Sequence, residues 1–553
     1  MAFLEAKQIR GHTYYYLIER ARVNGVSKKV RTVYLGTAEG LAAKVLGQRP
    51  RAGGPLRLKS FPFGPLAALW REAEQLDLVA TVDHYARKRP TPGLSVGQYL
   101  LLTILARSLE PWSKAATGRW FDRDCFLRFL WKVPHRVDSH NILANLRHLS
   151  ERAVQHRIEH AVAEKLVAQG FRPRRLFWDL TNYSTYIEEG EELPQPGHAK
   201  DRRYDLNLVG TALAVTEEHI PLLHETVPGN ADECEVFAEA VESLTTRLLR
   251  LNLDPSSMVL VIDRGPNSNE NLWEARGLMH VVGAIPPQLV PDLMQLDLGQ
   301  FAPLYTTEKG HPLLGCRTQR EVYGQSFTVV VTYNAATAKR KALTYERYER
   351  RFREGMAKIQ AGYERAHGRR LSFESAAAEA AELVPSQYRS VFRYVLHEDT
   401  HRLTWEVNTE AKARLLQRFG RRAFFTDLEG DAATIARTYE ERYKVEQDFR
   451  WLKGDEVMPF APLFVRNDAS IRAHAFLVVV GLLLWRLLWK RIRELGITAP
   501  EEEILTALNE LRLSLVGDQQ RGVLRSGRWV VEQHSTLAEE LFRKLDLSRA
   551  MPA

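Results

Sequence analysis

Four short apolar runs between residues 174 and 265 constrain the fold of this chain most. They are RRLFWDLT (174–181), LNLVGTALAVT (206–216), HIPLLHETV (219–227) and SMVLVIDRG (257–265). Each run is bounded by turn residues and has the length and composition of a β-strand. A helix is expected from Cys234 to Leu251, after the third run. The centre of the chain is therefore predicted to combine strands and helix.

Two of these runs lead into an aspartate where the chain leaves the apolar core. Asp179 follows Leu-Phe-Trp, and Asp263 follows Val-Leu-Val-Ile. We expect each carboxylate to lie at a strand end, where the sheet holds it rigidly and a crevice leaves it open to a metal ion. For either residue alone, a turn or cap role is the simpler alternative.

The residues before the strands have a helical pattern. Apolar positions recur every three or four residues from about 64 to 170, and Asp138-Ser139 precedes a helix, HNILANLRHLSERAVQHRI, with Arg and His on its polar face. A helix-turn-helix that binds DNA and an ordinary helical bundle both fit this pattern.

Charge is concentrated at the N-terminus. Among 553 residues, 45% are hydrophobic and 26% charged, as in a soluble globular protein. Residues 1–60 hold 12 basic and 3 acidic side chains, and the rest of the chain has 65 of each, so the whole net charge of +9 belongs to this segment. A polyanionic partner is the leading expectation.

A β-hairpin is predicted inside this basic segment. Residues 13–23 and 26–35 are rich in strand formers and are joined by Asn24-Gly25, which favours a tight turn. One face is expected to carry four basic side chains, from Arg20, Arg22, Lys29 and Arg31. They would contact DNA phosphates, although a solvated edge of a structural domain is the alternative. The stretch 47–55 is interpreted as a linker.

Cysteine content and hydropathy predict a cytoplasmic protein. The three cysteines are far apart and form no CxxC pair, which excludes a disulfide framework and a structural zinc site. The N-terminus lacks the apolar core of a signal peptide. The most apolar run, residues 475–485, is interrupted by Arg486 and is shorter than the roughly 18 residues that a membrane span needs. We expect a buried core helix there and no membrane association.

Several catalytic motifs are excluded. Residues 397–401 match HExxH, but the flanking residues alternate as strands, so the two histidines would lie on a hairpin turn rather than on the helix that zinc binding requires. The chain has no GxxxxGK[ST] or GxGxxG, and no nucleotide cofactor is expected.

The C-terminal half mixes strands with helices. Between 286 and 420, strand runs surround a charged helix with an apolar stripe at Tyr345, Phe352, Met356, Ile359 and Tyr363. A strand at 424–428 is expected to lead into one long helix from Asp431 to Lys453. Residues 495–553 are predicted to be helical and basic.

That long helix carries the most informative set of residues. Tyr439, Arg442, Glu446 and Lys453 occupy relative positions 0, 3, 7 and 14, which share a stripe about 60° wide on a continuous helix. A carboxylate between two cations and a phenol suits a metal-bound phosphodiester, whereas a salt-bridged surface helix is the alternative. Asp448 lies about 200° from Glu446, so replacing it is expected to be nearly silent.

The spacing Tyr-x2-Arg-x3-Glu-x6-Lys resembles the signature of bacterial DDE-type insertion-sequence transposases of the insertion sequence four superfamily, and the chain looks like its 1634-type branch. Further similarities are the basic hairpin ending in Thr-Val-Tyr-Leu-Gly, Asp-x-Thr at 179–181, the stretch 197–205, the strand into Asp263 and residues 464–474. Ala199 and Tyr204 depart from the serine and proline that relatives usually have.

The resemblance implies an α/β catalytic core of RNase H-like fold, interrupted by a mostly β insertion domain and preceded by a small basic β-hairpin domain and a helical domain. Asp179, Asp263 and Glu446 would be the catalytic and metal-binding triad, holding two Mg²⁺ ions that Mn²⁺ can replace. The expected regions are 1–60 (DNA-contacting hairpin), 61–170 (helical, DNA-end-binding), 171–285 and 421–490 (the two parts of the core), 286–420 (insertion) and 491–553 (helical C-terminal region).

The implied reaction is cleavage of DNA at terminal inverted repeats and transfer of the freed 3′-OH into target DNA, through a hairpin intermediate, by a homodimer. The expected DNA contacts beyond the N-terminal hairpin are Tyr439, Arg442, Lys453, Lys200, Arg203 and Trp405. Trp405 would stack a flipped base, or else pack in the core. A catalytically silent DNA-binding protein and a general RNase H-like nuclease are the alternatives.

Overall fold

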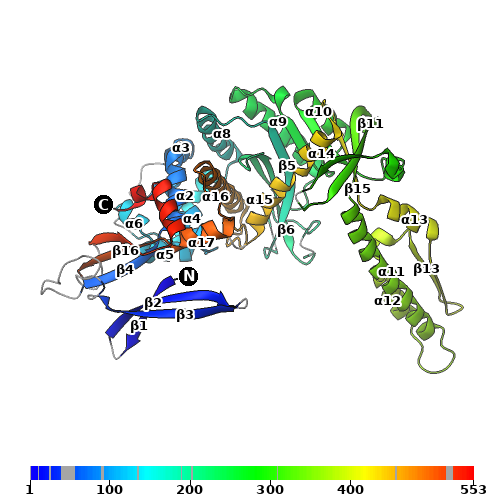
Figure 1. The fold of residues 1–553 in the computed structure, drawn as a ribbon, viewed down its shortest axis with the longest axis horizontal. Coiled ribbons are helices and arrows are strands. Elements are labelled where there is room, and N and C mark those ends of the chain that lie inside the picture. Colours follow the sequence, from blue (N-terminus) through cyan, green and yellow to red (C-terminus); the bar gives the residue numbers. More distant parts are fainter. Residues whose placement is uncertain are drawn as a thin grey trace. The chain divides into compact units, whose positions relative to one another are not determined.

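The computed structural model shows a mixed α/β protein, as Figure 1 illustrates. It describes residues 2–9, 12–23, 26–38, 41, 56–88, 93–133, 136–188, 190–200, 203–307, 309–454, 457–518 and 527–552. The predicted turn at Asn24-Gly25 and the predicted linker at 47–55 lie outside these residues. The chain divides into two compact units: Met1–Asp232, Glu242–Leu253 and Lys444–Ala553 form unit 1, and Glu233–Val241 and Asp254–Tyr443 form unit 2.

The predicted N-terminal hairpin is confirmed and gains a third strand. β2 (His12–Val23) pairs with β3 (Val26–Thr37), and β1 (Ala2–Ile9) pairs with the other edge of β2. Val23 lies opposite Val26, as predicted. A shift in register, however, places Lys29 opposite Arg20 and Arg31 opposite Glu19. Positions 19 and 20 are neighbours on β2 and therefore face opposite sides of the sheet. Their partners Arg31 and Lys29 consequently face opposite sides too, which corrects the prediction of one basic face.

The predicted helical region of unit 1 is also confirmed. Its helices are α2 (Gly64–Gln75), α3 (Leu78–Tyr85), α4 (Val96–Leu109), α5 (Lys114–Asp124), α6 (Leu127–Leu130), α7 (Ser139–Leu146) and α8 (Arg152–Ala168). The side chain of Asp138 accepts a hydrogen bond from the Asn141 backbone and caps α7. The helix predicted after Asp138-Ser139 is broken: a short 3₁₀ turn, Arg147–Leu149, separates α7 from α8.

The C-terminal region was predicted to be helical, and it contains helices α17 (Glu501–Glu510) and α18 (Thr536–Lys544). It also supplies two strands, β16 (Arg512–Asp518) and β17 (Arg528–Val531), which corrects that prediction. β16 pairs with β4 (Leu56–Pro62), which precedes α2, in a sheet of order β17-β16-β4.

Unit 1 also holds an antiparallel meander with the order β5-β6-β7. Its strands are β5 (Arg175–Thr185), β6 (Asn207–Thr216) and β7 (Pro221–Pro228). The strands match three predicted apolar runs, but β5 is longer than expected. Asp179 therefore lies inside β5, opposite Leu213, and not at a strand end.

The predicted buried helix around 475–485 is α16 (Asp468–Glu494). By length and composition alone α16 could cross a membrane, yet 94% of its most apolar window is buried inside the protein. Arg486 lies within this buried helix and forms an ion pair of 2.5 Å with Asp448, which is itself fully buried. Burial in the core explains the apolar composition of α16.

Unit 2 contains a mixed sheet with the strand order β10-β11-β12-β15-β9-β8. The strands are β8 (Val259–Ile262), β9 (His280–Ile285), β10 (Ala302–Thr306), β11 (Pro312–Val322), β12 (Gln325–Tyr333) and β15 (Arg421–Thr426). β8 and β9 are parallel and are connected by α10 (Asn269–Leu278), and the other pairs are antiparallel. The helix predicted from Cys234 is α9 (Glu233–Arg250), whose residues belong partly to each unit.

The segment 286–420 differs from the mostly β insertion that was predicted. Its strands β10 to β12 extend the sheet through β15, and most of the remainder is helical. The helices are α11 (Ala335–Tyr363), α12 (Phe373–Glu382) and α13 (Thr409–Arg418), beside one hairpin of β13 (Phe392–His397) and β14 (Arg402–Val407). All five residues of the predicted apolar stripe of α11 are buried in one cluster with this hairpin.

The long helix predicted from Asp431 to Lys453 is two helices. α14 (Ala432–Glu440) is capped by the Asp431 side chain, and α15 (Tyr443–Lys453) begins after a break. Tyr439 therefore belongs to α14 and Arg442 to the break, whereas Glu446 and Lys453 lie on α15. The single continuous stripe is wrong, but Glu446 and Lys453, seven residues apart, still share one face of α15.

Candidate active site

Asp263 is positioned by two of the four signature residues. It follows β8 directly, as predicted, and its side chain is 39% exposed. The Tyr439 hydroxyl donates a hydrogen bond of 3.0 Å to Oδ1, and the Arg442 guanidinium lies 3.4 Å from Oδ2. Because a carboxylate offers about four lone-pair positions, these contacts leave acceptor capacity for a cation.

Tyr439 is held rigidly for this contact. Its ring is 7% exposed and stacks on Phe424 of β15 at a centroid distance of 4.3 Å. Burial, and then the charge of Asp263, raise the pKa of Tyr439. The phenol therefore stays protonated at neutral pH and acts as a hydrogen-bond donor to Asp263. Sequence reasoning had placed Tyr439 only against DNA.

Cations gather near this end of β8. Burial, followed by the positive charges of Arg422, Arg264 and Arg340, lowers the pKa of Lys341. Such mutual repulsion means that these basic groups are close together, and Arg264 directly follows Asp263.

A second group of residues surrounds Asp179 in unit 1. Asp179, Thr181 and Tyr183 share one face of β5 because side chains alternate along a strand. Tyr183 is buried and stacks on Phe460, with 3.9 Å between ring centroids. The Lys453 ammonium of α15 lies 5.6 Å from the centre of the Tyr183 ring. This contact links the signature lysine to the strand of Asp179.

Glu446 lies on the exposed surface of α15, and so does Lys453. Lys444, at the start of the same helix, lies 5.7 Å from the ring of Phe177, two residues before Asp179. Both ends of α15 thus have a lysine over an aromatic ring of β5. Sequence reasoning missed Tyr183, Phe177 and Phe460, although the alternation around Asp179 was a usable signal.

The stretch 197–205 is attached to β5. The Lys200 ammonium donates to the carbonyl of Leu180, and Asn182 donates a hydrogen bond of 2.8 Å to the carbonyl of His198. Arg203, which was predicted to bind DNA, forms two hydrogen bonds of 2.9 Å with Asp205. Of the two departures from the family pattern, Ala199 is buried and Tyr204 is exposed.

Residues 464–474, also part of the resemblance, support the same region. Asn467 caps α16, and the neighbouring Asp468 accepts hydrogen bonds of 2.9 and 3.2 Å from the backbone of Glu192 and Leu193. The segment that leads into residues 197–205 is thereby fixed to the start of α16.

The other predicted DNA contacts have varied surroundings. Lys29 and Arg31 are exposed, and each lies within 4 Å of a glutamate, Glu5 and Glu19 respectively. The side chains of Arg20 and Arg22 lie outside the described part of the structure. Trp405 of β14 packs edge-on against Phe352 and donates to Gln360. Core packing, the alternative for Trp405, is what these contacts support.

The histidines of the HExxH motif lie on the predicted turn: β13 ends at His397, and His401 precedes β14. Within either unit, the described residues hold no cluster of three or more His, Cys, Asp or Glu side chains suited to a metal ion. Asp179 and Glu446 belong to unit 1 and Asp263 to unit 2. The chemistry of the three carboxylates fits a hard divalent cation, since each is at least partly exposed.

No protein-family model matches the chain, and no curated protein matches it either.

Proposed function

We propose that this protein is a DDE-type transposase that cleaves DNA at terminal inverted repeats and joins the freed 3′-OH to target DNA. The observation that carries the proposal is the contact of Tyr439 and Arg442 with Asp263, 176 residues before Tyr439. The sequence indicates Asp263 through its position after an apolar strand, and it indicates Tyr439 and Arg442 through their spacing along a predicted helix. A surface helix without catalytic function has no need to orient a strand-end carboxylate.

The order of elements supports an RNase H-like core for this transposase. An antiparallel meander containing Asp179 is followed by helix α9, by the parallel pair β8 and β9 with Asp263, and later by α15 with Glu446. The three acids thus come from a strand, a strand end and a helix, and rigid elements suit residues that must hold precise positions.

In the proposed site, Asp179, Asp263 and Glu446 would hold two Mg²⁺ ions, or Mn²⁺ in their place. When bound, such ions activate a nucleophile and stabilise the leaving oxygen of a phosphodiester. Tyr439 and Arg442 orient the carboxylate of Asp263, and Lys453 holds a DNA phosphate. The proposed partners are double-stranded DNA and a second copy of the chain.

The decisive test compares Glu446→Gln with Glu429→Gln, which removes an exposed carboxylate outside the site. The substrate is a plasmid carrying the DNA that flanks the gene on both sides. We expect wild-type protein and Glu429→Gln to nick it in Mg²⁺ at the outer ends of that DNA and to join the ends to a second plasmid. Glu446→Gln should bind the same DNA but lose nicking by several orders of magnitude, because it lacks one metal-binding charge.

Different results would favour the other candidates. Nicking that ignores the flanking DNA would indicate a general nuclease. Binding without any Mg²⁺- or Mn²⁺-dependent cleavage by the wild-type protein would indicate a catalytically silent DNA-binding protein. Equal nicking by Glu446→Gln and wild type would remove Glu446 from the site.

A further inference from the structure

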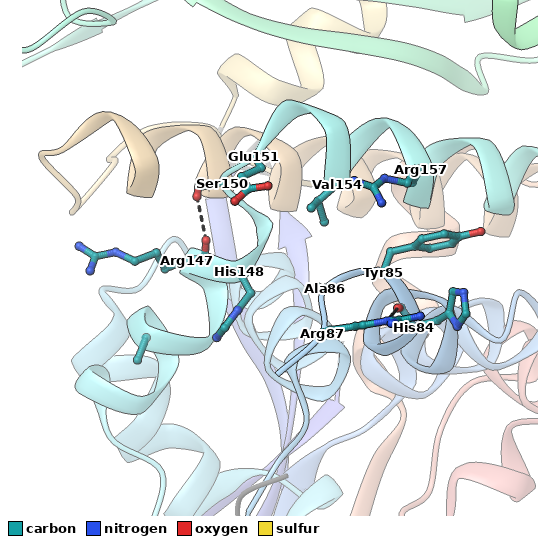
Figure 2. Close-up of a pocket in the computed structure, with 11 residues that line it drawn as sticks. His84, Tyr85, Ala86, Arg87, Arg147, His148, Ser150, Glu151, Val154 and Arg157 are labelled. Carbon is teal, nitrogen blue, oxygen red and sulfur yellow. Dashed lines mark hydrogen bonds between the residues drawn. The ribbon is translucent and has the colours of Figure 1, made fainter. Parts of the chain in front are cut away.

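A wide polar cleft lies in the helical part of unit 1. Its volume is about 830 Å³, and Figure 2 shows side chains from three segments around it: the end of α3 and the residues after it, the 3₁₀ turn after α7, and the start of α8. The charged or titratable lining residues are His84, Tyr85, Arg87, Arg147, His148, Glu151 and Arg157. The cleft is separate from the carboxylates of the candidate active site in sequence and chemistry.

The arginines of this cleft are available to a ligand. Arg87, Arg147 and Arg157 are all exposed, and none forms an ion pair within the described residues. Arg87 and Arg157 direct their Nε atoms to backbone carbonyls of His84 and Ala153, which leaves the ends of both guanidinium groups uncommitted. Three arginines against one glutamate give the cleft a positive charge.

The cleft is built unlike a pocket for a small molecule. Such pockets are mostly apolar and enclose their ligand, whereas the apolar lining here is limited to Ala86, Ala144, Val154 and the ring of Tyr85. Arginines that come from separate segments suit a ligand with regularly repeated negative charges. The phosphates of a nucleic-acid backbone have this arrangement, and most protein–DNA hydrogen bonds are made to them.

We infer that this cleft binds the phosphate backbone of duplex DNA through Arg87, Arg147 and Arg157. The inference rests on the proposed function for the choice of DNA, and it assigns the DNA contact expected of residues 61–170 to three named arginines, separate from the N-terminal hairpin. It also gives a role to the break between α7 and α8, because the turn at Arg147–Leu149 brings Arg147 and His148 to the rim of the cleft.

The test is a triple variant, Arg87→Gln, Arg147→Gln and Arg157→Gln, in the full chain. Binding to a duplex of random sequence is measured over a range of salt concentrations. Each lost phosphate contact lowers the slope of log affinity against log salt by about 0.9, so the slope should fall by about 2 to 3. The matched control replaces Arg119, Arg123 and Arg174, which are exposed in unit 1 outside the cleft, and should leave the slope unchanged.

A second variant tests the sign of the effect. Glu151→Gln removes the one carboxylate of the cleft, so DNA affinity should rise several-fold at low salt. The inference is overturned if the cleft and control variants have the same slope, or if the cleft variant loses affinity for single-stranded RNA but not for duplex DNA. Failure of the proposed function is distinguishable, because Glu446→Gln tests cleavage while all cleft variants retain the three carboxylates.

Discussion

Replacing Asp448 by asparagine should destabilise unit 1 strongly. Asp448 is fully buried, and its Oδ1 lies 2.6 Å from Nε and 2.5 Å from an Nη of Arg486, whose side chain is 5% exposed. The guanidinium of Arg486 also stacks on Trp451, 3.4 Å from the ring centre. The substitution keeps the shape of the side chain but leaves a buried cation without its counter-ion.

Loss of one partner of a buried ion pair costs about 3 to 5 kcal/mol. Unit 1 contains roughly 350 residues, and unfolding entropy is about 2.1 cal/mol/K per residue, so the melting temperature should fall by about 4 to 7 °C. The sequence-based expectation that Asp448→Asn is nearly silent concerned nicking and considered only the direction of the side chain, so the loss of stability expected from its burial is a separate effect.

The assay is thermal unfolding followed by circular dichroism, with Glu446→Gln as a control two residues away on the exposed side of α15. The control should melt within about 1 °C of wild type, as expected for an exposed position. The double replacement Asp448→Leu with Arg486→Met should recover most of the loss, since an apolar pair can replace a buried ion pair. Normal melting of Asp448→Asn would refute the reasoning, and normal melting with lost nicking would make Asp448 the third acid.

Two further predictions concern Tyr439 and Glu159. Tyr439→Phe keeps the stacking on Phe424 but removes the hydrogen bond to Asp263, so nicking should require about tenfold more Mg²⁺; an unchanged Mg²⁺ requirement in a titration would contradict the orienting role. Burial alone would raise the pKa of Glu159, but Arg247, 2.8 Å away, and His224 outweigh it and lower the pKa to about 2. A carboxyl group whose pKa is lower in the folded than in the unfolded chain stabilises the fold at pH values above the unfolded pKa. For Glu159 this contribution is up to about 3 kcal/mol, and it is lost as the pH falls from about 4.5 towards 2. Glu159→Gln should therefore melt well below wild type at pH 7, and the difference should shrink by pH 3.

Local patterns predicted many elements because the signals were contained within short windows. The hairpin of β2 and β3, the strands β5 to β8 and the apolar face of α11 all follow from alternation, helical spacing and turn residues. Asp263 after β8 also follows from a local pattern. These features depend on neighbours in sequence, and no distant segment is needed to specify them.

The errors have a common physical cause, which is that distant segments decide the result. The strand β16 looks like part of a helical region until its partner β4 is known. Asp179 seemed to end a strand because polar residues follow it, yet β6 pairs with β5 through Thr185. The break before α15 leaves almost no signal in YEERYKVEQ, so Tyr439 could not be assigned to Asp263 from helix geometry.

The pairing of β4 with β16 has a consequence for the order in which this protein acquires its structure. Leu513 of β16 lies opposite Phe61 of β4, so more than 400 residues are synthesised between the two partners. At a synthesis rate of about 5 to 20 residues per second, β16 is made roughly 20 to 90 seconds after β4. During that interval the edge of β4 is an open template for pairing with other chains, and its apolar side chains lack their cover. Chaperone contact or premature association should therefore concentrate at residues 56–62 in newly made chains, while the strands that pair with their neighbours in sequence have already formed.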